Sequence, residues 1–227
     1  MKHSKFLTFG FLVFVIAASI LFSGCVQQEE AEEAEPVDYV EITAYEGEDL
    51  SSIDDFRENS IKGPQHVDKE SYALRITGLV ENPQTYSYDE VVGAFDPRKK
   101  VVRLDCVEGW GVTILWEGVL VGDLLQEANP DSNATVVIFH AYDGYTTSFP
   151  LEYIQDNDII MAYKMNNVTL PPERGFPFEL VAESKWGYKW IKWITEIELS
   201  DDVTYRGYWE SRGYSNTGNV TESFLGR

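Results

Sequence analysis

The stretch Arg-Leu-Asp-Cys-Val-Glu-Gly-Trp-Gly, residues 103–111, holds Cys106, the one cysteine after the first 25 residues. A lone thiol can pack as a small apolar group, act as a nucleophile or ligate a soft metal ion. Asp105 and Glu108 flank it, and negative neighbours raise the pKa of a thiol, which disfavours a free thiolate nucleophile. A metal ion deprotonates a coordinating thiol despite such neighbours.

The scarcity of soft ligands narrows the choice of metal chemistry. The chain has two cysteines and three histidines, which excludes zinc sites of the CxxC…CxxC type and leaves few ligands for haem. The protein therefore needs a cofactor to complete a metal shell around Cys106. A cysteine-dependent hydrolase that pairs Cys106 with His140 and Asp143 stays open as an alternative.

The elements that must position Cys106 are mostly strands. Alternating or continuous apolar runs predict six strands, and helical spacing predicts two short helices, the first capped by Ser87 with Glu90 three residues on. The sequence predicts an α+β fold, β-rich with mixed sheets, in a single domain, and it has no GxGxxG or P-loop motif. The predicted strands cover 72–80, 99–107, 135–142, 145–149, 158–165 and 188–199, and the helices cover 86–95 and 119–128.

Composition supports a folded core and excludes some partners. Of the 227 residues, 44% are hydrophobic and 14% are aromatic, which suffices for one sizeable domain. The chain has 18 basic and 38 acidic residues, a net charge of −20. Such a charge disfavours nucleic acid and anionic lipid as partners, and an anionic substrate would need a local cluster of cations.

The N-terminal segment resembles a targeting signal. Lys2 and Lys5 precede an apolar run that ends in Ser23-Gly24-Cys25, as in a lipoprotein signal that leaves Cys25 lipidated, and a plain anchor helix is the alternative. Either reading predicts an extracytoplasmic protein anchored to the cell membrane. We expect a signal at 1–25, a glutamate-rich linker at 26–50, the domain at 51–217 and a tail at 218–227.

Several separate blocks of sequence resemble the sulfite-oxidase-type molybdopterin-binding oxidoreductase domain family, and within it the branch of the periplasmic methionine-sulfoxide reductase catalytic subunits. The blocks are VVRLDCVEGWG with LWEGVLVGDLL, FHAYDGYTTSFPLE, the run from Leu170 to Leu199, and YRGYWESRGYSN, in the same order over roughly residues 50–217. The resemblance implies the family's β-rich α+β fold, a molybdenum-molybdopterin cofactor and oxygen-atom transfer. It also implies that Cys106 is the molybdenum ligand.

The resemblance further implies which other residues contact the cofactor or the substrate. Lys192 is a candidate for its phosphate, Arg174 for its phosphate or for an anionic group of the substrate, and Arg212 and Tyr214 for the substrate. The full set of expected cofactor contacts is Arg57, Asn59, His140, Arg174, Gly187, Tyr188, Lys189, Trp190, Ile191 and Lys192.

Two positions depart from the family pattern. Glu179 stands where the family usually has arginine, and Ala141 stands where the reductase branch has a threonine that contacts the cofactor. These departures allow an alternative, a non-catalytic binding module on the same fold with a degraded cofactor site. The leading hypothesis is an oxidoreductase for a small, sulfur-containing substrate that exchanges electrons with a separate electron-transfer protein or a membrane redox subunit.

Overall fold

The computed structural model describes residues 40–226. The predicted signal, Cys25 and most of the predicted linker lie outside the described residues. Between residues 40 and 226 the chain forms twelve strands and three α-helices, and none of these helices is long and apolar enough to cross a membrane.

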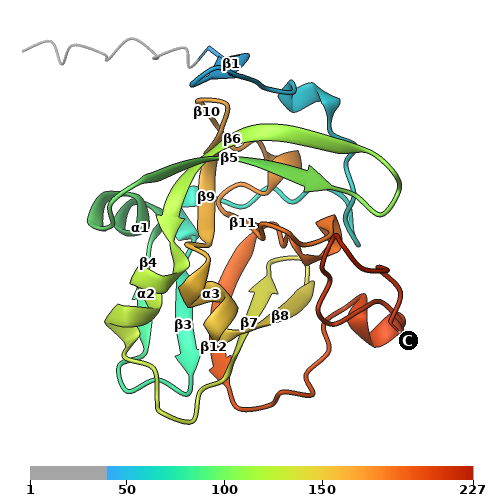
Figure 1. Cartoon of the computed structure of the whole chain (residues 1–227). Helices are drawn as coiled ribbons and strands as arrows, with labels where there is room; N and C mark the ends of the chain where they lie inside the picture. The colour runs from blue at the N-terminus through green and yellow to red at the C-terminus, as the bar shows by residue number, and fades with distance from the viewer. Residues whose placement is uncertain (1–39, 227) are drawn as a thin grey trace, which may run out of the picture. The chain divides into compact units, whose positions relative to one another are not determined.

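The first of two five-stranded sheets contains the strand that leads to Cys106. Its path runs β10-β9-β6-β5, all antiparallel, and β11 pairs with β9 beside it. Figure 1 shows β5 and β6 crossing above the second sheet. The strands are β5 (Arg98–Asp105), β6 (Gly111–Leu120), β9 (Ile160–Met165), β10 (Val168–Thr169) and β11 (Glu179–Val181).

The second sheet has the order β4-β3-β12-β7-β8. Strands β12 and β3 are parallel while the other pairs are antiparallel, so the sheet is mixed, as predicted. The β-rich α+β prediction is confirmed. The strands are β3 (Leu74–Gly78), β4 (Gln84–Tyr86), β7 (Val136–Ala141), β8 (Thr146–Pro150) and β12 (Ile194–Ser200).

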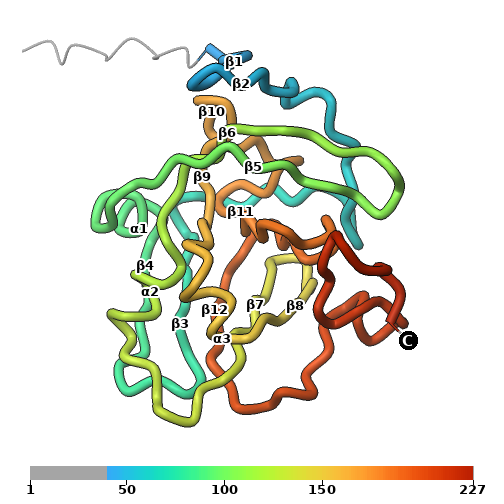
Figure 2. Tube along the Cα trace, viewed as in Figure 1, coloured from blue at the N-terminus to red at the C-terminus, as the bar shows by residue number. Residues whose placement is uncertain are grey.

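The helices are short and lie against the strands, as the trace in Figure 2 makes clear. Helix α1 (Tyr88–Ala94) begins with the predicted capping box of Ser87 and Glu90. Helix α2 (Val121–Ala128) buries one apolar face, and α3 (Leu151–Asp156) was not predicted. Single 3₁₀ turns follow the chain as η1 (Ile53–Asp55), η2 (Lys69–Ser71), η3 (Pro172–Arg174), η4 (Gly187–Lys189) and η5 (Glu210–Arg212).

The longest strand, β6, was missed by the sequence analysis. Its two edges pair with β9 and β5, and six successive residues from Ile114 to Val119 are buried, so both of its faces are covered. A strand buried on both faces lacks the polar alternation by which half-buried strands are recognised.

The prediction of one strand over 188–199 was wrong in its first half. Strand β12 begins only at Ile194, and it is preceded by η4 and by Trp193, whose φ is 55°. Trp190, Ile191 and Trp193 are all buried, so the apparent alternation was partly accidental. Trp190, Ile191 and Lys192 therefore lie in an irregular segment ahead of the last strand.

Both ends of the described chain pack on the domain. Residues 41–50, predicted as linker, include the hairpin β1 (Ala44–Tyr45) with β2 (Glu48–Asp49), and Ile42 N donates to Asn166 O at 3.1 Å. At the other end, Trp186 N donates to Gly218 O at 2.8 Å. The folded part thus extends beyond residues 51 and 217 on both sides.

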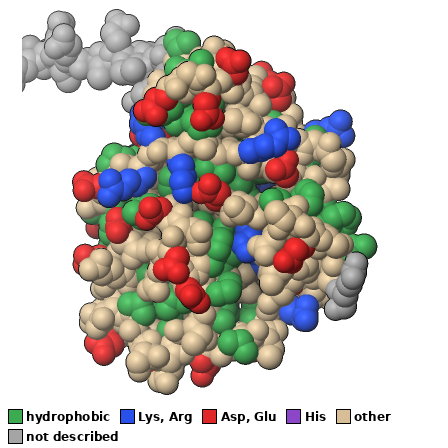
Figure 3. All heavy atoms as spheres, in the orientation of Figure 1, with side chains coloured by type: hydrophobic (Ala, Val, Ile, Leu, Met, Phe, Trp, Pro, Cys, Tyr) green, Lys and Arg blue, Asp and Glu red, His purple; other side chains and the backbone are tan. Residues whose placement is uncertain are grey.

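Acidic side chains are spread over the face seen in Figure 3, with lysines and arginines between them. Their scatter fits the interpretation that the negative charge serves solubility rather than one binding patch.

A buried ion pair ties the C-terminal segment to the second sheet. Lys189 Nζ lies 2.7 Å from Glu210 Oε1, and both side chains are 0% exposed. Lys189 also donates to Ser148 O, and Thr147 Oγ1 donates to Glu210 Oε1 at 2.6 Å. Burial lowers the pKa of Lys189, which Glu210 opposes. The ammonium group of Lys189, predicted as a cofactor contact, is thus engaged with the protein interior.

Breaking this pair from one side should destabilise the protein. We expect Glu210→Gln to lower the free energy of unfolding by about 3–5 kcal/mol, because Lys189 would keep a buried charge without its counterion. Urea denaturation followed by tryptophan fluorescence measures the loss. The double variant Lys189→Met/Glu210→Gln, which removes both charges, should lose less than either single variant, and an equal or larger loss would contradict this account.

Candidate functional site

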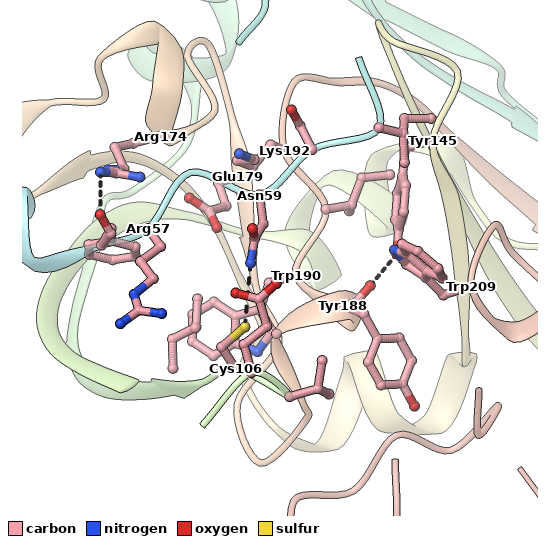
Figure 4. A pocket seen from close by; sticks show the side chains of 18 of the residues that line it. Arg57, Asn59, Cys106, Tyr145, Arg174, Glu179, Tyr188, Trp190, Lys192 and Trp209 are labelled. Carbon is pink, nitrogen blue, oxygen red and sulfur yellow. Dashed lines mark hydrogen bonds between the residues drawn. The ribbon is translucent and has the colours of Figure 1, made fainter. Parts of the chain in front are cut away.

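A cavity of about 280 Å³ lies where the two sheets meet the N- and C-terminal segments. Its walls come from residues 56–61, the end of β5 with the loop before β6, the turn between β7 and β8, η3, β11, the segment from η4 to β12, and the C-terminal segment near η5. Cys106 lies in this cavity (Figure 4).

A tight turn holds Cys106 at the end of β5. Cys106 N donates to Trp110 O at 2.8 Å and Gly109 N donates to Cys106 O at 3.0 Å, while Gly109 has a φ of 87°, which favours glycine. Asn59 Nδ2 donates to Cys106 Sγ at 3.6 Å. Beside this turn, a Cβ placed on Gly187 would lie 3.6 Å from Cys106 Cα, so the two segments are in direct contact.

The surroundings of Cys106 do not make a free nucleophile. Burial raises the pKa of the thiol, and hydrogen bonds from the Glu108 backbone and from Asn59 only partly oppose this. His140, the candidate base, lies outside the cavity walls, and its Nε2 pairs with Glu198 Oε2 at 2.9 Å. The cysteine-hydrolase alternative therefore loses its histidine, and His140, predicted as a cofactor contact, does not line the cavity that contains Cys106.

Three cations line one end of the cavity, and two of them are already engaged. Arg174 Nη2 donates to Phe56 O at 3.2 Å, and its guanidinium lies 4.7 Å from the centre of the Phe56 ring. Lys192 Nζ lies 3.0 Å from Glu58 Oε1. Within residues 40–226 Arg57 has no hydrogen-bond or ion-pair partner, so its exposed guanidinium can bind an anionic group.

Aromatic rings line the opposite end (Figure 4). Tyr145 Oη donates to Tyr188 O at 2.5 Å, and the rings of Tyr188 and Trp209 each lie 5.0 Å from that of Tyr214. These rings form a wall with mostly apolar surface, suited to carbon and sulfur groups of a ligand.

Glu179 is the buried acid of the cavity. It stands on β11, is 4% exposed, and its Oε2 has no hydrogen-bond partner among the described residues. Burial raises its pKa to about 8, although the charges of Lys192 and Arg174 act in the opposite direction. At neutral pH the carboxyl therefore holds a proton that it can donate to a ligand.

Unpartnered polar atoms gather around this cavity. Of the five buried side-chain polar atoms without a partner in the described chain, those of Ser60, Trp110 and Glu179 belong to cavity-lining residues, and the other two belong to Glu210 and Asn216. Native proteins rarely leave such atoms unpaired. Together with the thiol of Cys106 and the free guanidinium of Arg57, they fit a polar cofactor with an anionic group.

The protein offers few other ligands for a metal. Among residues 40–226 no three His, Cys, Asp or Glu side chains are close enough together to hold a metal ion. A metal bound to Cys106 would need further ligands from a cofactor.

Most of the predicted site residues converge on the cavity, and three do not. His140 and Lys189 are bound elsewhere as described, and Arg212 Nη1 donates to Tyr208 O at 2.6 Å outside the cavity. Ala141 does not line the cavity either, so that departure leaves its wall unaffected. The predicted residues that line it are Arg57, Asn59, Cys106, Arg174, Gly187, Tyr188, Trp190, Ile191, Lys192 and Tyr214.

Sequence reasoning missed several residues of the walls. Tyr145 follows the Asp143-Gly144 turn, and Trp110 lies between two glycines. Glycines of this kind indicate a loop, and loops often line binding sites. Ser60 carried no such signal, because it comes from an irregular segment with no pattern of its own.

Comparisons with known proteins agree on one family. Residues 61–209 match the model of the oxidoreductase molybdopterin binding domain. The chain is 32% identical over 157 residues to the uncharacterized oxidoreductase YuiH of Bacillus subtilis (strain 168), which covers 69% of this chain and 78% of that protein.

Two further relatives are named as subunits of methionine-sulfoxide reductases. The chain is 32% identical to the putative protein-methionine-sulfoxide reductase subunit YedZ1 of Azospira oryzae, over 66% of this chain and 57% of that protein. It is 31% identical to the protein-methionine-sulfoxide reductase catalytic subunit MsrP of Gluconobacter oxydans, over 57% of this chain and 47% of that protein. The match thus spans about half the length of these two relatives.

The fold is also that of a solved structure. The sulfane dehydrogenase SoxCD of Paracoccus pantotrophus superposes with a TM-score of 0.63 at 23% sequence identity, over 70% of this chain and 44% of the other. At this identity the likeness concerns the fold alone.

The raised pKa of Glu179 should make stability depend on pH. The folded state holds this proton more tightly than the unfolded chain, where the ordinary pKa is 4.5. The free energy of unfolding should therefore fall as the pH rises from about 4.5 to about 8, by about 1.4 kcal/mol per pH unit.

Glu179→Gln should abolish this contribution, because glutamine does not titrate. The measurement is a series of urea midpoints for both proteins across this pH range. Glu152→Gln, which changes an exposed glutamate on α3, should keep the wild-type slope. Identical slopes for the wild type and Glu179→Gln would show that Glu179 is ionised throughout.

Proposed function

The chain belongs to the oxidoreductase molybdopterin binding domain family and is an oxidoreductase with a molybdenum-molybdopterin cofactor. On this premise we propose that it transfers an oxygen atom to or from a small, sulfur-containing substrate. The observation that carries the proposal is the thiol of Cys106 in a cavity whose lining residues carry unpartnered polar atoms. Two relatives are named as subunits of methionine-sulfoxide reductases, which supports the substrate class.

Cys106 would hold the cofactor through its sulfur. The bound cofactor supplies a metal centre that exchanges two electrons with the substrate as the oxygen atom is transferred. Asn59 donates a hydrogen bond to the same sulfur and so orients it as a ligand. Gly187 lies directly beside Cys106, so its segment forms the part of the cavity wall next to the sulfur ligand.

Arg57 would bind the anionic part of the cofactor. Its guanidinium has no partner between residues 40 and 226, while Arg174 and Lys192 are engaged with Phe56 O and Glu58. A guanidinium binds a phosphate through two parallel hydrogen bonds. Arg174 and Lys192 then add charge at the same end of the cavity.

The electrons would come from or pass to a separate protein. Two relatives are named as subunits, and the part of the chain that the structure describes has no cluster of ligands for a second metal centre. A separate electron-transfer protein or a membrane redox subunit is the partner that we propose.

The targeting signal supports an extracytoplasmic place for this reaction. The basic start, the apolar run and Ser23-Gly24-Cys25 fit a lipoprotein signal, with a lipid on Cys25 as the anchor and the glutamate-rich segment as the spacer to the domain.

Cofactor binding should depend on Cys106 and Arg57. We expect about one molybdenum and one pterin per chain in protein from a molybdenum-replete host. Cys106→Ser should abolish oxygen-atom transfer, and Arg57→Ala should lower the cofactor content at least about tenfold through the loss of a charge-assisted contact.

Metal analysis and pterin fluorescence measure these contents. Arg98→Ala removes an exposed arginine of β5 outside the cavity and should retain full cofactor content. Wild-type protein that is folded but contains neither metal nor pterin would support the alternative of a non-catalytic binding module.

Membrane anchoring should depend on Cys25. We expect the wild type to carry a lipid label and to appear in the membrane fraction. Cys25→Ser should lose the label, since the thiol is the site of acylation. Growth with a labelled fatty acid, followed by fractionation, measures both. Lipid-free wild type in the membrane fraction would favour the anchor-helix alternative, and wild type in the soluble fraction would contradict both.

A further inference from the structure

The charges along the cavity leave little capacity for an anionic substrate. Arg174 and Lys192 already contact Phe56 O and Glu58, so Arg57 is the cation without a partner among the cavity residues that the structure describes. A phosphate-bearing cofactor would occupy that guanidinium. A second anion would then enter a cavity that is also lined by the acidic residues Glu108, Asp143 and Glu173.

Glu179 is built to donate a hydrogen bond rather than to carry charge. Its side chain is 4% exposed, one carboxyl oxygen has no partner among residues 40–226, and it lines the same cavity as Cys106. Figure 4 shows its carboxyl between the basic end with Arg174 and the aromatic end with Trp209. A buried, protonated carboxyl donates to a neutral oxygen acceptor without a new buried charge.

We propose that this site selects uncharged substrates that carry a transferable oxygen, such as sulfoxides, over oxyanions, and that Glu179 is the specificity-determining residue because it donates a hydrogen bond to that oxygen. The inference rests on the proposed function and names its substrate class. The pKa of Glu179, about 8, means that at neutral pH the carboxyl carries the proton that this hydrogen bond requires.

The reaction balances without a further oxidant or reductant beyond the electron donor. A sulfoxide takes two electrons and two protons, its S–O bond breaks, and a thioether and one water molecule form. The electrons come from a one-electron donor such as a reduced viologen dye in the assay, and the protons come from solvent. Glu179 binds the oxygen before the bond breaks and is unchanged after the water leaves.

The charged groups that face Glu179 come from two neighbouring segments. Lys192, ahead of β12, and Arg174, on η3, both favour its ionised form, yet burial outweighs them. Cys106 and Glu108 line the cavity from the loop after β5, and Asp143 lines it from the turn after β7. Variants at position 179 separate its titration from theirs.

The experiment compares glutamine and leucine at position 179 in the molybdenum-loaded enzyme. Glutamine keeps a hydrogen-bond donor of the same shape but does not titrate, whereas leucine keeps neither. For dimethyl sulfoxide at pH 6, we expect Glu179→Gln to retain kcat/KM within about threefold, and Glu179→Leu to lose about tenfold or more. Between pH 6 and pH 9 the wild type should lose about tenfold more than Glu179→Gln does.

Selectivity gives the second part of the test. At pH 6 the wild type should reduce dimethyl sulfoxide with a kcat/KM at least about tenfold above that for chlorate, an oxyanion oxygen donor. Glu179→Gln should keep this ratio because it keeps the donor, and Glu179→Leu should narrow it. Infrared difference spectra of the wild type minus Glu179→Gln, with and without cofactor, should show a protonated carboxyl band at pH 6 that weakens by pH 9. Glu152→Gln is the matched control and should behave as the wild type throughout.

Each failure points to a different conclusion. Equal kcat/KM for chlorate and dimethyl sulfoxide, or wild-type behaviour of Glu179→Leu, overturns the role of Glu179 while oxygen-atom transfer stands. If Glu179→Leu does not fold, the pH profiles of the wild type and Glu179→Gln decide alone, and parallel profiles overturn the proposal. If neither the molybdenum-loaded wild type nor any loaded variant transfers oxygen to or from any substrate tested, the proposed function itself is overturned.

Discussion

The buried ion pair between Lys189 and Glu210 fixes two walls of the cavity at once. Lys189 ends the 3₁₀ turn that begins with Gly187, the residue that passes close to Cys106. Glu210 follows Trp209, which lines the aromatic end. Because both side chains are removed from water, neither can shift without a large electrostatic cost. The distance between the thiol and the aromatic wall is therefore set by a contact that lies outside the cavity.

Inside the cavity, charge is limited by burial rather than by the number of charged residues. Arg174 and Lys192 are held by partners of their own, and Glu179 holds a proton because its oxygens are out of contact with water. A cavity of this kind can bind one anionic group at Arg57 and present a neutral donor at Glu179. The cavity thus combines a cation that binds a charged cofactor with an uncharged donor that faces the substrate.

The sequence alone was informative where a local pattern sufficed. Alternation in β3 and the capping box of α1 predicted those elements, and the blocks around Cys106 predicted the family and most of the cavity residues. The misses have physical causes. Strand β6 is buried on both faces and so does not alternate, and Lys189 looks like any lysine until the fold places Glu210 beside it. No sequence pattern distinguishes a lysine that binds a ligand from one that is buried in an ion pair.

The walls of the cavity come from Phe56 near one end of the domain and from Tyr214 near the other. Closing the loop between residues so far apart in sequence costs chain entropy before their contacts are gained. During synthesis the chain is complete up to Cys106 well before Trp209 and Tyr214 leave the ribosome. The aromatic wall therefore cannot close before the segment with Trp209 and Tyr214 has been synthesised, so the cavity around Cys106 is completed by a later part of the chain.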